Sequence, residues 1–96
     1  MSSEISKNLK QQISLLENVP GVYQFYDISE SLLYVGKAKK LKNRVSSYFN
    51  KIKFENGKTQ LMVQKVKSLK AIQLNSEIDA LLLENSLIKK YQPRYN

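Results

Sequence analysis

The chain has 96 residues, with sixteen Lys and Arg against eight Asp and Glu, a formal net charge of +8, and neither His nor Cys. Without Cys there are no disulfides, thiolate nucleophiles or zinc–thiolate sites, and without His the commonest general base is missing. Any chemistry near neutral pH must come from Tyr, Lys or carboxylate side chains. The charge favours a polyanionic partner, with nucleic acid ahead of an acidic membrane.

A membrane-spanning helix needs about 20 mostly apolar residues, and an exported chain begins with a basic and then apolar leader. The sequence contains neither pattern. We therefore expect a cytoplasmic protein with no membrane partner.

The first part of the chain predicts a helix followed by a hairpin. Apolar residues recur at helical spacing over residues 4–16, and Pro20 then breaks the pattern. Residues 21–26 and 32–36 are rich in Val, Tyr, Phe and Leu, which favour strands, and a five-residue connection lies between them.

Each predicted strand carries a Tyr next to a short glycine-containing motif, Gly21-Val22-Tyr23 in the first and Tyr34-Val35-Gly36 in the second. Adjacent strands would present both phenols at one site. Aromatic residues are also common in ordinary hairpins, so the two tripeptides alone leave a purely structural role open.

A basic segment follows the hairpin. Residues 31–54 contain seven cations and no carboxylate, and five of the cations are Lys37, Lys39, Lys40, Lys42 and Arg44. Residues 38–49 predict a helix with one apolar face, formed by Leu41, Val45, Tyr48 and Phe49. Lys37, Lys40 and Arg44 follow at helical spacing along one flank, which predicts either a DNA-binding surface or an ordinary solvated face.

The last part of the chain predicts a polar loop over residues 50–57, a helix over 58–67 and a short strand over 71–74. Ser76, with Asp79 three residues later, is typical of a capped helix start, and we expect that helix to run to about residue 90.

The element order is helix, hairpin, helix, helix, strand, helix, which predicts a single α/β (α+β) domain over residues 1–96. Residues 1–16 would be a leading helix and residues 17–96 the core. The chain ends at Asn96 without a polar tail, which suggests a piece of a longer protein.

Glu84 departs from the polar pattern of the last helix. A helical wheel places it among apolar residues on the inward side, whereas the polar arc holds Asp79, Ser86, Lys89 and Lys90. An isolated carboxylate in apolar surroundings costs several kcal/mol unless it is paired or bound to a metal. Two explanations remain open, a structural ion pair with a Lys and a hydrated divalent cation such as magnesium.

Three residues of the basic segment are candidates for a site. Arg44 is its only arginine, and a guanidinium grips two phosphate oxygens where Lys offers a point charge, although an exposed helix cation is the simpler interpretation. Lys37 either lies near Tyr34 and lowers the pKa of that phenol or is a solvated lysine. Tyr48 shares the flank of Arg44 and is either a core aromatic or part of the site. Together these residues favour phosphodiester hydrolysis with one metal ion.

The sequence resembles the GIY-YIG nuclease family, with the two tripeptides in place of the motifs that name it. The segments from Tyr34 to Phe49 and from Glu77 to Asn96 extend the similarity to the amino-terminal domains of the UvrC branch, over about residues 17–96. Both tripeptides have Val where the family name has Ile, which is a conservative difference.

The resemblance implies a small three-stranded antiparallel sheet flanked by helices. It also implies an endonuclease of excinuclease ABC type that makes the 3′ incision beside a DNA lesion in nucleotide excision repair. The implied partners are DNA, UvrB with UvrA upstream, and the remainder of UvrC. The UvrB-binding, second-nuclease and helix-hairpin-helix regions of a full UvrC are absent, so 5′ incision and damage recognition are not expected of this segment.

The resemblance also assigns roles to residues. Tyr34 corresponds to the general base, with Lys37 nearby and Tyr23 in the supporting hydrogen bonds. Arg44 polarises the phosphate, and Glu84 is the only protein ligand of one Mg²⁺ or Mn²⁺ ion. Tyr48 and Asn96 complete the pocket, with Gly21 and Gly36 as supporting residues of the two motifs.

Two other functions remain open. The charge alone is consistent with a basic DNA-binding or docking module without catalysis, whose binding would survive Glu84→Gln. A freestanding GIY-YIG endonuclease is a further possibility, which the match after Ser76 makes less favourable.

Overall fold

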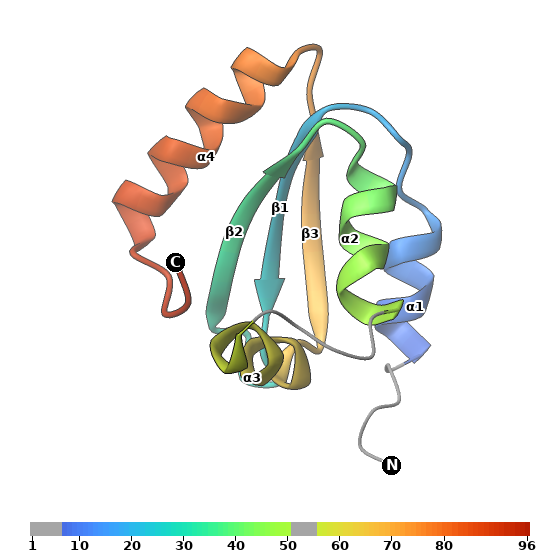
Figure 1. Ribbon diagram of the computed structural model, residues 1–96, viewed down its shortest axis with the longest axis vertical. Coiled ribbons are helices and arrows are strands. Elements are labelled where there is room, and N and C mark those ends of the chain that lie inside the picture. The colour runs from blue at the N-terminus through green and yellow to red at the C-terminus, as the bar shows by residue number, and fades with distance from the viewer. Residues whose placement is uncertain (1–6, 51–55) are drawn as a thin grey trace.

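The structure is a computed structural model that describes residues 7–50 and 56–96. Its centre is a three-stranded antiparallel sheet in the order β2-β1-β3 (Figure 1). The strands are β1 (Gly21–Tyr26), β2 (Leu32–Ala38) and β3 (Ser68–Gln73). The predicted sheet is confirmed. Residues 4–6 of the predicted first helix and residues 51–55 of the predicted loop lie outside the described residues.

The hairpin of β1 and β2 forms where the sequence predicts it. Asp27 follows β1, and its carboxylate accepts hydrogen bonds from the backbone N–H groups of Ser29 and Ser31, each at 2.9 Å. An Asp side chain that bonds the backbone just beyond it stabilises a tight turn. The register shifts between Phe25 and Tyr26, so a bulge lies next to the turn.

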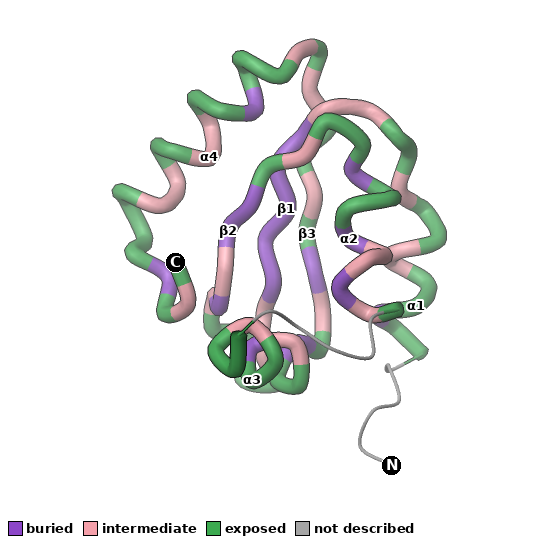
Figure 2. The backbone as a smooth tube through the Cα atoms, in the orientation of Figure 1, coloured by how far each residue is buried: buried purple, intermediate pink, exposed green. Residues whose placement is uncertain are grey.

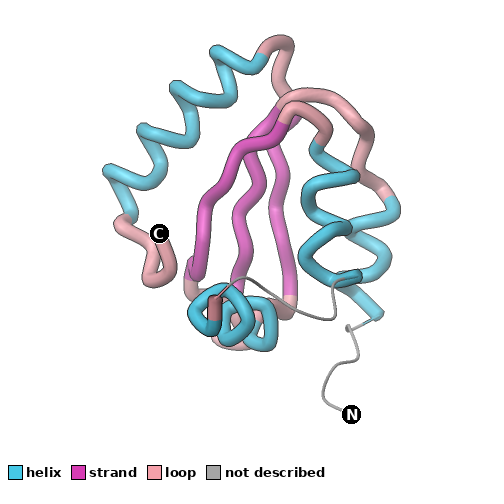
Figure 3. The backbone as a smooth tube through the Cα atoms, viewed as in Figure 1, coloured by secondary structure: helices cyan, strands magenta, loops and turns pink. Residues whose placement is uncertain are grey.

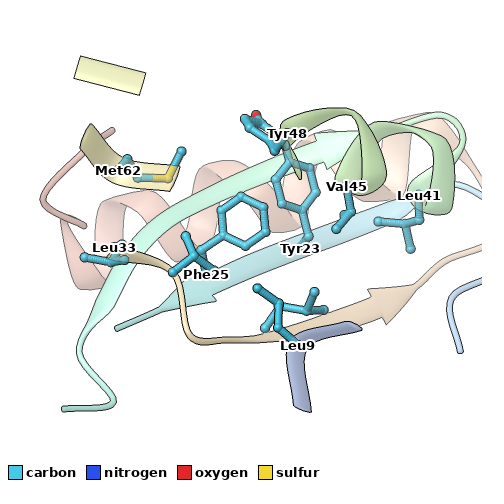
Figure 4. Close-up of a cluster of buried hydrophobic side chains, with 10 residues drawn as sticks. Leu9, Tyr23, Phe25, Leu33, Leu41, Val45, Tyr48 and Met62 are labelled. Carbon is cyan, nitrogen blue, oxygen red and sulfur yellow. The ribbon is translucent and has the colours of Figure 1, made fainter. Parts of the chain in front are cut away.

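One face of the sheet packs against α1 (Lys7–Ser14) and α2 (Leu41–Asn50), which lie side by side in Figure 1. Cross-strand partners share a face, and the pairs Phe25↔Tyr34 and Tyr23↔Gly36 place these four residues on this one. Figure 4 shows the larger of two buried clusters, to which the sheet, α1, α2 and α3 contribute Leu9, Tyr23, Phe25, Leu33, Leu41, Val45, Tyr48 and Met62.

The opposite face is covered in part by α4 (Glu77–Tyr91), which packs beside β2 and β1 (Figure 3). A smaller buried cluster of Val22, Val35 and Ala80 joins α4 to the sheet. Because both faces of β1 are covered, all residues from Gly21 to Phe25 are buried, as the purple tube of Figure 2 shows. The remaining helix, α3 (Gly57–Lys65), begins at the cap Asn56 and lies across the end of the sheet.

The predicted boundaries of the second strand, of the helix that follows it and of the third strand are wrong. The second strand continues to Ala38 because Lys37 and Ala38 pair with Val22 and Gly21 of β1, and α2 begins only at Leu41. Lys37 and Lys40 therefore precede the helix, and the proposed cationic flank from Lys37 to Arg44 does not exist as one helix face. The third strand begins at Ser68, three residues before the predicted start, since pairing with β1 extends it.

No helix among the described residues is long and apolar enough to cross a membrane.

The start of α4 offers a test of the fold. The Ser76 hydroxyl accepts a hydrogen bond from the Asp79 N–H at 3.2 Å, as the capping pattern predicts. We expect Ser76→Ala to lower the free energy of unfolding by about 1 kcal/mol, because a backbone donor loses its partner. Ser86→Ala, on the exposed side of the same helix, should be neutral or slightly stabilising. Equal urea midpoints for the two variants would contradict this role of Ser76.

Candidate active site

Three tyrosines gather on the sheet face that α2 covers. Tyr23 comes from β1, Tyr34 from β2 and Tyr48 from α2, and their ring centroids lie 5.8 to 6.5 Å apart. The tyrosines of the two tripeptides therefore do meet, as the sequence predicts. Figure 4 shows the Tyr23 and Tyr48 rings close together over the sheet.

A chain of hydrogen bonds connects two of these phenols to a cation. The hydroxyls of Tyr23 and Tyr48 lie 2.7 Å apart, and Nη2 of Arg44 donates to the Tyr48 hydroxyl at 3.3 Å. Arg44 and Tyr48 are four residues apart on α2, so their side chains share one side of the helix. The Arg44 guanidinium also lies 5.1 Å from the Tyr48 ring centroid. Arg44 is thereby held at the rim of the tyrosine cluster.

The surroundings of these phenols keep them protonated. Burial, then the charge of Tyr48 and a hydrogen bond with it, raise the pKa of Tyr34 to about 12, against a lowering effect of Arg44. Burial also raises the pKa of Tyr23, followed by its interactions with Tyr48. At neutral pH both groups are neutral hydroxyls, which can donate and accept hydrogen bonds.

The absence of a side chain at Gly36 leaves the space that the Tyr23 ring occupies. A Cβ atom at position 36 would overlap the Tyr23 hydroxyl and the ring carbon that bears it. Tyr23 pairs across the sheet with Gly36, so its ring lies directly over the glycine. The glycine of the second motif is thus required by the tyrosine of the first. Gly21 has a comparable role, because a Cβ there would meet the carbonyl oxygen of Ile72 and the side chain of Leu41.

Asn96 holds the free edge of β2. Its side-chain oxygen accepts a hydrogen bond from the Val35 N–H at 2.9 Å, and its Nδ2 donates to the Val35 carbonyl at 2.8 Å. The Tyr95 N–H adds a bond to the Leu33 carbonyl at 2.9 Å. These bonds fix the backbone on both sides of Tyr34. Asn96 therefore positions the strand that carries the tyrosine.

Glu84 is half-buried on the side of α4 that faces β2, and its charge contributes to raising the pKa of Tyr34. The prediction of an inward-facing acid is confirmed in part. Its neighbours Leu83, Leu87 and Ile88 pack against the smaller cluster, but Leu81, one turn before Glu84, is 42% exposed. Among the described residues, the one ion pair joins Lys39 to Glu77, so Glu84 is not engaged by a lysine there.

The four lysines predicted to bind DNA are on the surface, but Lys37 does not lie beside Tyr34. Lys37, Lys39, Lys40 and Lys42 are all exposed. Lys37 pairs across the sheet with Val22, which puts it on the face of α4 rather than on that of Tyr34. The prediction that Lys37 lowers the pKa of Tyr34 is wrong, because that pKa is raised and the cation that opposes the rise is Arg44.

Two contributors to the site have no obvious signal in the sequence. Asn18 accepts a hydrogen bond from the Asn43 N–H at 2.9 Å and donates to the Asn43 side chain at 3.1 Å, which anchors α2 one residue before Arg44. Phe25 lies 5.2 Å, between ring centroids, from both Tyr23 and Tyr48. The Asn pair joins residues 25 positions apart, so no local pattern announces it.

Comparison with known proteins agrees with this geometry. The family described as "UvrC-like GIY-YIG domain" matches residues 19–96 of the chain. The chain belongs to this family. Among curated members, UvrABC system protein C of Flavobacterium psychrophilum is 56% identical over 89 residues, which cover 93% of this chain. The Bacteroides fragilis protein of the same name is 53% identical over 91 residues, or 95% of this chain.

Solved structures of the UvrC-like GIY-YIG family share the fold. The amino-terminal endonuclease domain of UvrC from Thermotoga maritima, bound to magnesium as its catalytic divalent cation, has a TM-score of 0.82 and 36% sequence identity. The match covers 96% of this chain and 99% of that one. In contrast, the chain spans only 15% of the length of the two curated relatives.

The contact between Gly36 and Tyr23 can be tested by adding a methyl group. We expect Gly36→Ala to lower the free energy of unfolding by about 1 to 3 kcal/mol, because the Tyr23 ring must move in a packed core. Gly57→Ala is the matched control, since a Cβ there meets nothing within 4 Å and the φ angle is not positive. The control should unfold at the same or slightly higher urea concentration. A loss in both variants, or in neither, would contradict the packing role of Gly36.

The raised pKa of Tyr34 predicts a loss of stability in alkali. An unfolded tyrosine titrates near pH 10, whereas folded Tyr34 has a pKa of about 12. Between these values the unfolded chain releases a proton that the folded chain retains, so the free energy of unfolding falls as pH rises. The contribution of Tyr34 is complete below about pH 10 and is lost through about pH 12.

Urea unfolding at several pH values above about 9 measures this decline. We expect Tyr34→Phe to make it shallower, because the variant has no phenol at that position to titrate. Tyr91→Phe, which replaces a ring that is 52% exposed, should change the decline by less. A steeper or unchanged decline in Tyr34→Phe would contradict the environment described for this tyrosine.

Proposed function

We propose that this chain is a metal-dependent DNA endonuclease domain of UvrC type that makes the 3′ incision beside a lesion in nucleotide excision repair. The single observation that supports this most is that Tyr34 of β2 lies near enough to Arg44 of α2 and Glu84 of α4 for both charges to act on its pKa. In this proposal residues 17–96 are the nuclease core and residues 1–16 a leading segment within a domain of 1–96. The whole excinuclease reaction belongs to the full-length relatives, of which the chain spans a small part.

Arg44 would bind the scissile phosphate. Its Nη2 donates to the Tyr48 hydroxyl, which leaves other guanidinium donors for phosphate oxygens. A guanidinium held in place before the substrate arrives stabilises the charge that develops in the transition state without reorganisation. Tyr23 and Tyr48 are positioning residues in this scheme, because their paired hydroxyls fix the guanidinium. The exposed Lys37, Lys39, Lys40 and Lys42 would contact flanking phosphates.

Glu84 fits a magnesium or manganese site of one protein ligand. No group of three or more His, Cys, Asp or Glu residues that could hold a metal occurs in the part of the chain that the structure describes. Mg²⁺ is often bound through one or two carboxylates while retaining several waters, so a single half-buried acid suits it. A bound ion would supply positive charge at the phosphate and its leaving oxygen.

Tyr34 would be the base that acts on the attacking water: its phenol would first release its own proton to solvent, and the phenolate oxygen would then take the proton of the water. Its hydroxyl oxygen is an acceptor, and Arg44 lowers its pKa against the larger effect of burial. The hydrogen bonds of Asn96 and Tyr95 hold the strand on both sides of it. Positioning of this acceptor, rather than a permanent phenolate, is what the chain itself provides at neutral pH.

The proposed partners are DNA, UvrB with UvrA upstream in the pathway, and the remainder of a UvrC chain, in the cytoplasm. DNA has direct support in the +8 charge and the exposed lysines. The protein partners have support from the similarity to UvrABC system proteins alone.

Glu84→Gln tests the function. The chain is combined with UvrA, UvrB, the complementing remainder of UvrC and lesion DNA, and 3′ incision is measured in magnesium. We expect at least about a 100-fold loss, because the neutral amide holds the ion poorly. Asp79→Asn, which neutralises an exposed acid on the same helix, is the matched control and should retain incision within a few-fold.

Manganese binding to the isolated chain provides a second readout. It should disappear in Glu84→Gln and persist in the parent chain and in the control variant. Full incision by Glu84→Gln would refute the metal-ligand role. DNA binding without any incision by the parent chain would instead favour a non-catalytic basic module.

A further inference from the structure

A cavity lies where the end of β2 meets the start of α4. In Figure 1 these two segments lie at the same end of the sheet as the beginning of α2. Its volume is about 470 Å³. It is lined by residues from these two segments: Lys37, Ala38, Lys39, Glu77, Ile78, Ala80 and Leu81. A volume of this size lies within the range of sites that bind small organic molecules.

The cavity and Glu84 lie along the same flank of α4. Glu77, Leu81 and Glu84 are spaced four and three residues apart, so they follow one another on one side of the helix. Leu81 precedes Glu84 by about one turn, or roughly 5 Å along the helix axis. On the other wall, Lys37 lies on the face of β2 that α4 covers, opposite to Tyr34. The cavity therefore lies about one helical turn from Glu84, on the α4 side of the sheet.

The lining combines an apolar interior with a cationic rim. Ala80 is buried at the base, whereas Ile78 and Leu81 remain 69% and 42% exposed. Lys39 pairs with Glu77 at 3.7 Å, which offsets the one carboxylate of the rim. Lys37 has no ion pair within the described ranges, so the rim has a net positive charge. Apolar walls below lysines suit a ligand with a flat, weakly polar group attached to phosphates.

We propose that this cavity receives an unpaired nucleobase of the DNA strand being cut, with its flanking phosphates on Lys37 and Lys39. The inference rests on the proposed function and extends it by naming how the strand is held. A nucleotide leaves the stack at least cost where the duplex is damaged or already unpaired. A pocket for one extruded base next to Glu84 would favour incision near such positions, without any reading of sequence.

Two small probes distinguish the contribution of the base to binding from that of the phosphates. Thymidine 3′,5′-bisphosphate carries one base between two phosphates, and 1,2-dideoxyribose 3′,5′-bisphosphate carries the same phosphates and no base. Binding of each to the 96-residue chain is measured by calorimetry without divalent metal. We expect the thymidine probe to bind about tenfold more tightly, because burial of the base on apolar walls adds to the phosphate contacts.

Leu81→Gln removes an apolar wall without changing charge, and it should bring the difference between the probes to within about twofold. Leu82→Gln is the matched control, since Leu82 is 60% exposed on the same helix and does not line the cavity. The control should keep the tenfold preference. Circular dichroism of both variants verifies that the fold is intact.

Equal binding of the two probes by the parent chain would overturn the pocket, as would an equal effect of Leu81→Gln and Leu82→Gln. If either result occurs while Glu84→Gln still abolishes incision, the pocket is wrong and the nuclease function stands. If the base preference holds but incision is indifferent to Glu84, the proposed catalytic function fails while the base site remains.

Discussion

The contact between the Tyr23 and Tyr48 hydroxyls, 2.7 Å apart, is the interaction on which the site depends. It joins the central strand of the sheet to α2, and Arg44 donates to the same Tyr48 oxygen from one turn earlier. The pair exists only because Gly36 leaves room for the Tyr23 ring. A buried hydroxyl without a partner costs free energy, so the network specifies one position for the guanidinium.

The site uses both helical layers around one thin sheet. Arg44 and Tyr48 come from α2 on one face, whereas Glu84 comes from α4, which packs on the other face beside β2. Tyr34 stands on the edge strand between them, and the bonds of Asn96 to Val35 hold that edge. A cation and an acid from separate layers thus lie close enough to one phenol for both charges to act on its pKa.

The sequence predicts the tyrosine motifs, the apolar face of α2, the cap of α4 and the inward tendency of Glu84, because each follows from a local spacing. The sequence mispredicts strand boundaries and side-chain positions that depend on pairing between distant segments. The pairing of Lys37 with Val22 lengthens β2 and turns this lysine to the face of α4, which no helical wheel reveals. The Asn18–Asn43 bonds and the early start of β3 likewise arise from contacts across the fold. The raised pKa of Tyr34 depends on burial that only the packed structure defines.

The central claim is that Glu84 presents a carboxylate to a hydrated divalent ion in the space shared by Tyr34 and Arg44. A crystal of this chain grown in manganese, with anomalous scattering recorded at the manganese edge, tests it most directly. We predict one anomalous peak at about 2.1 Å from a Glu84 carboxylate oxygen, with waters completing its coordination. A peak at other acids only, or Glu84 closed onto a lysine with no ion beside it, would contradict the account.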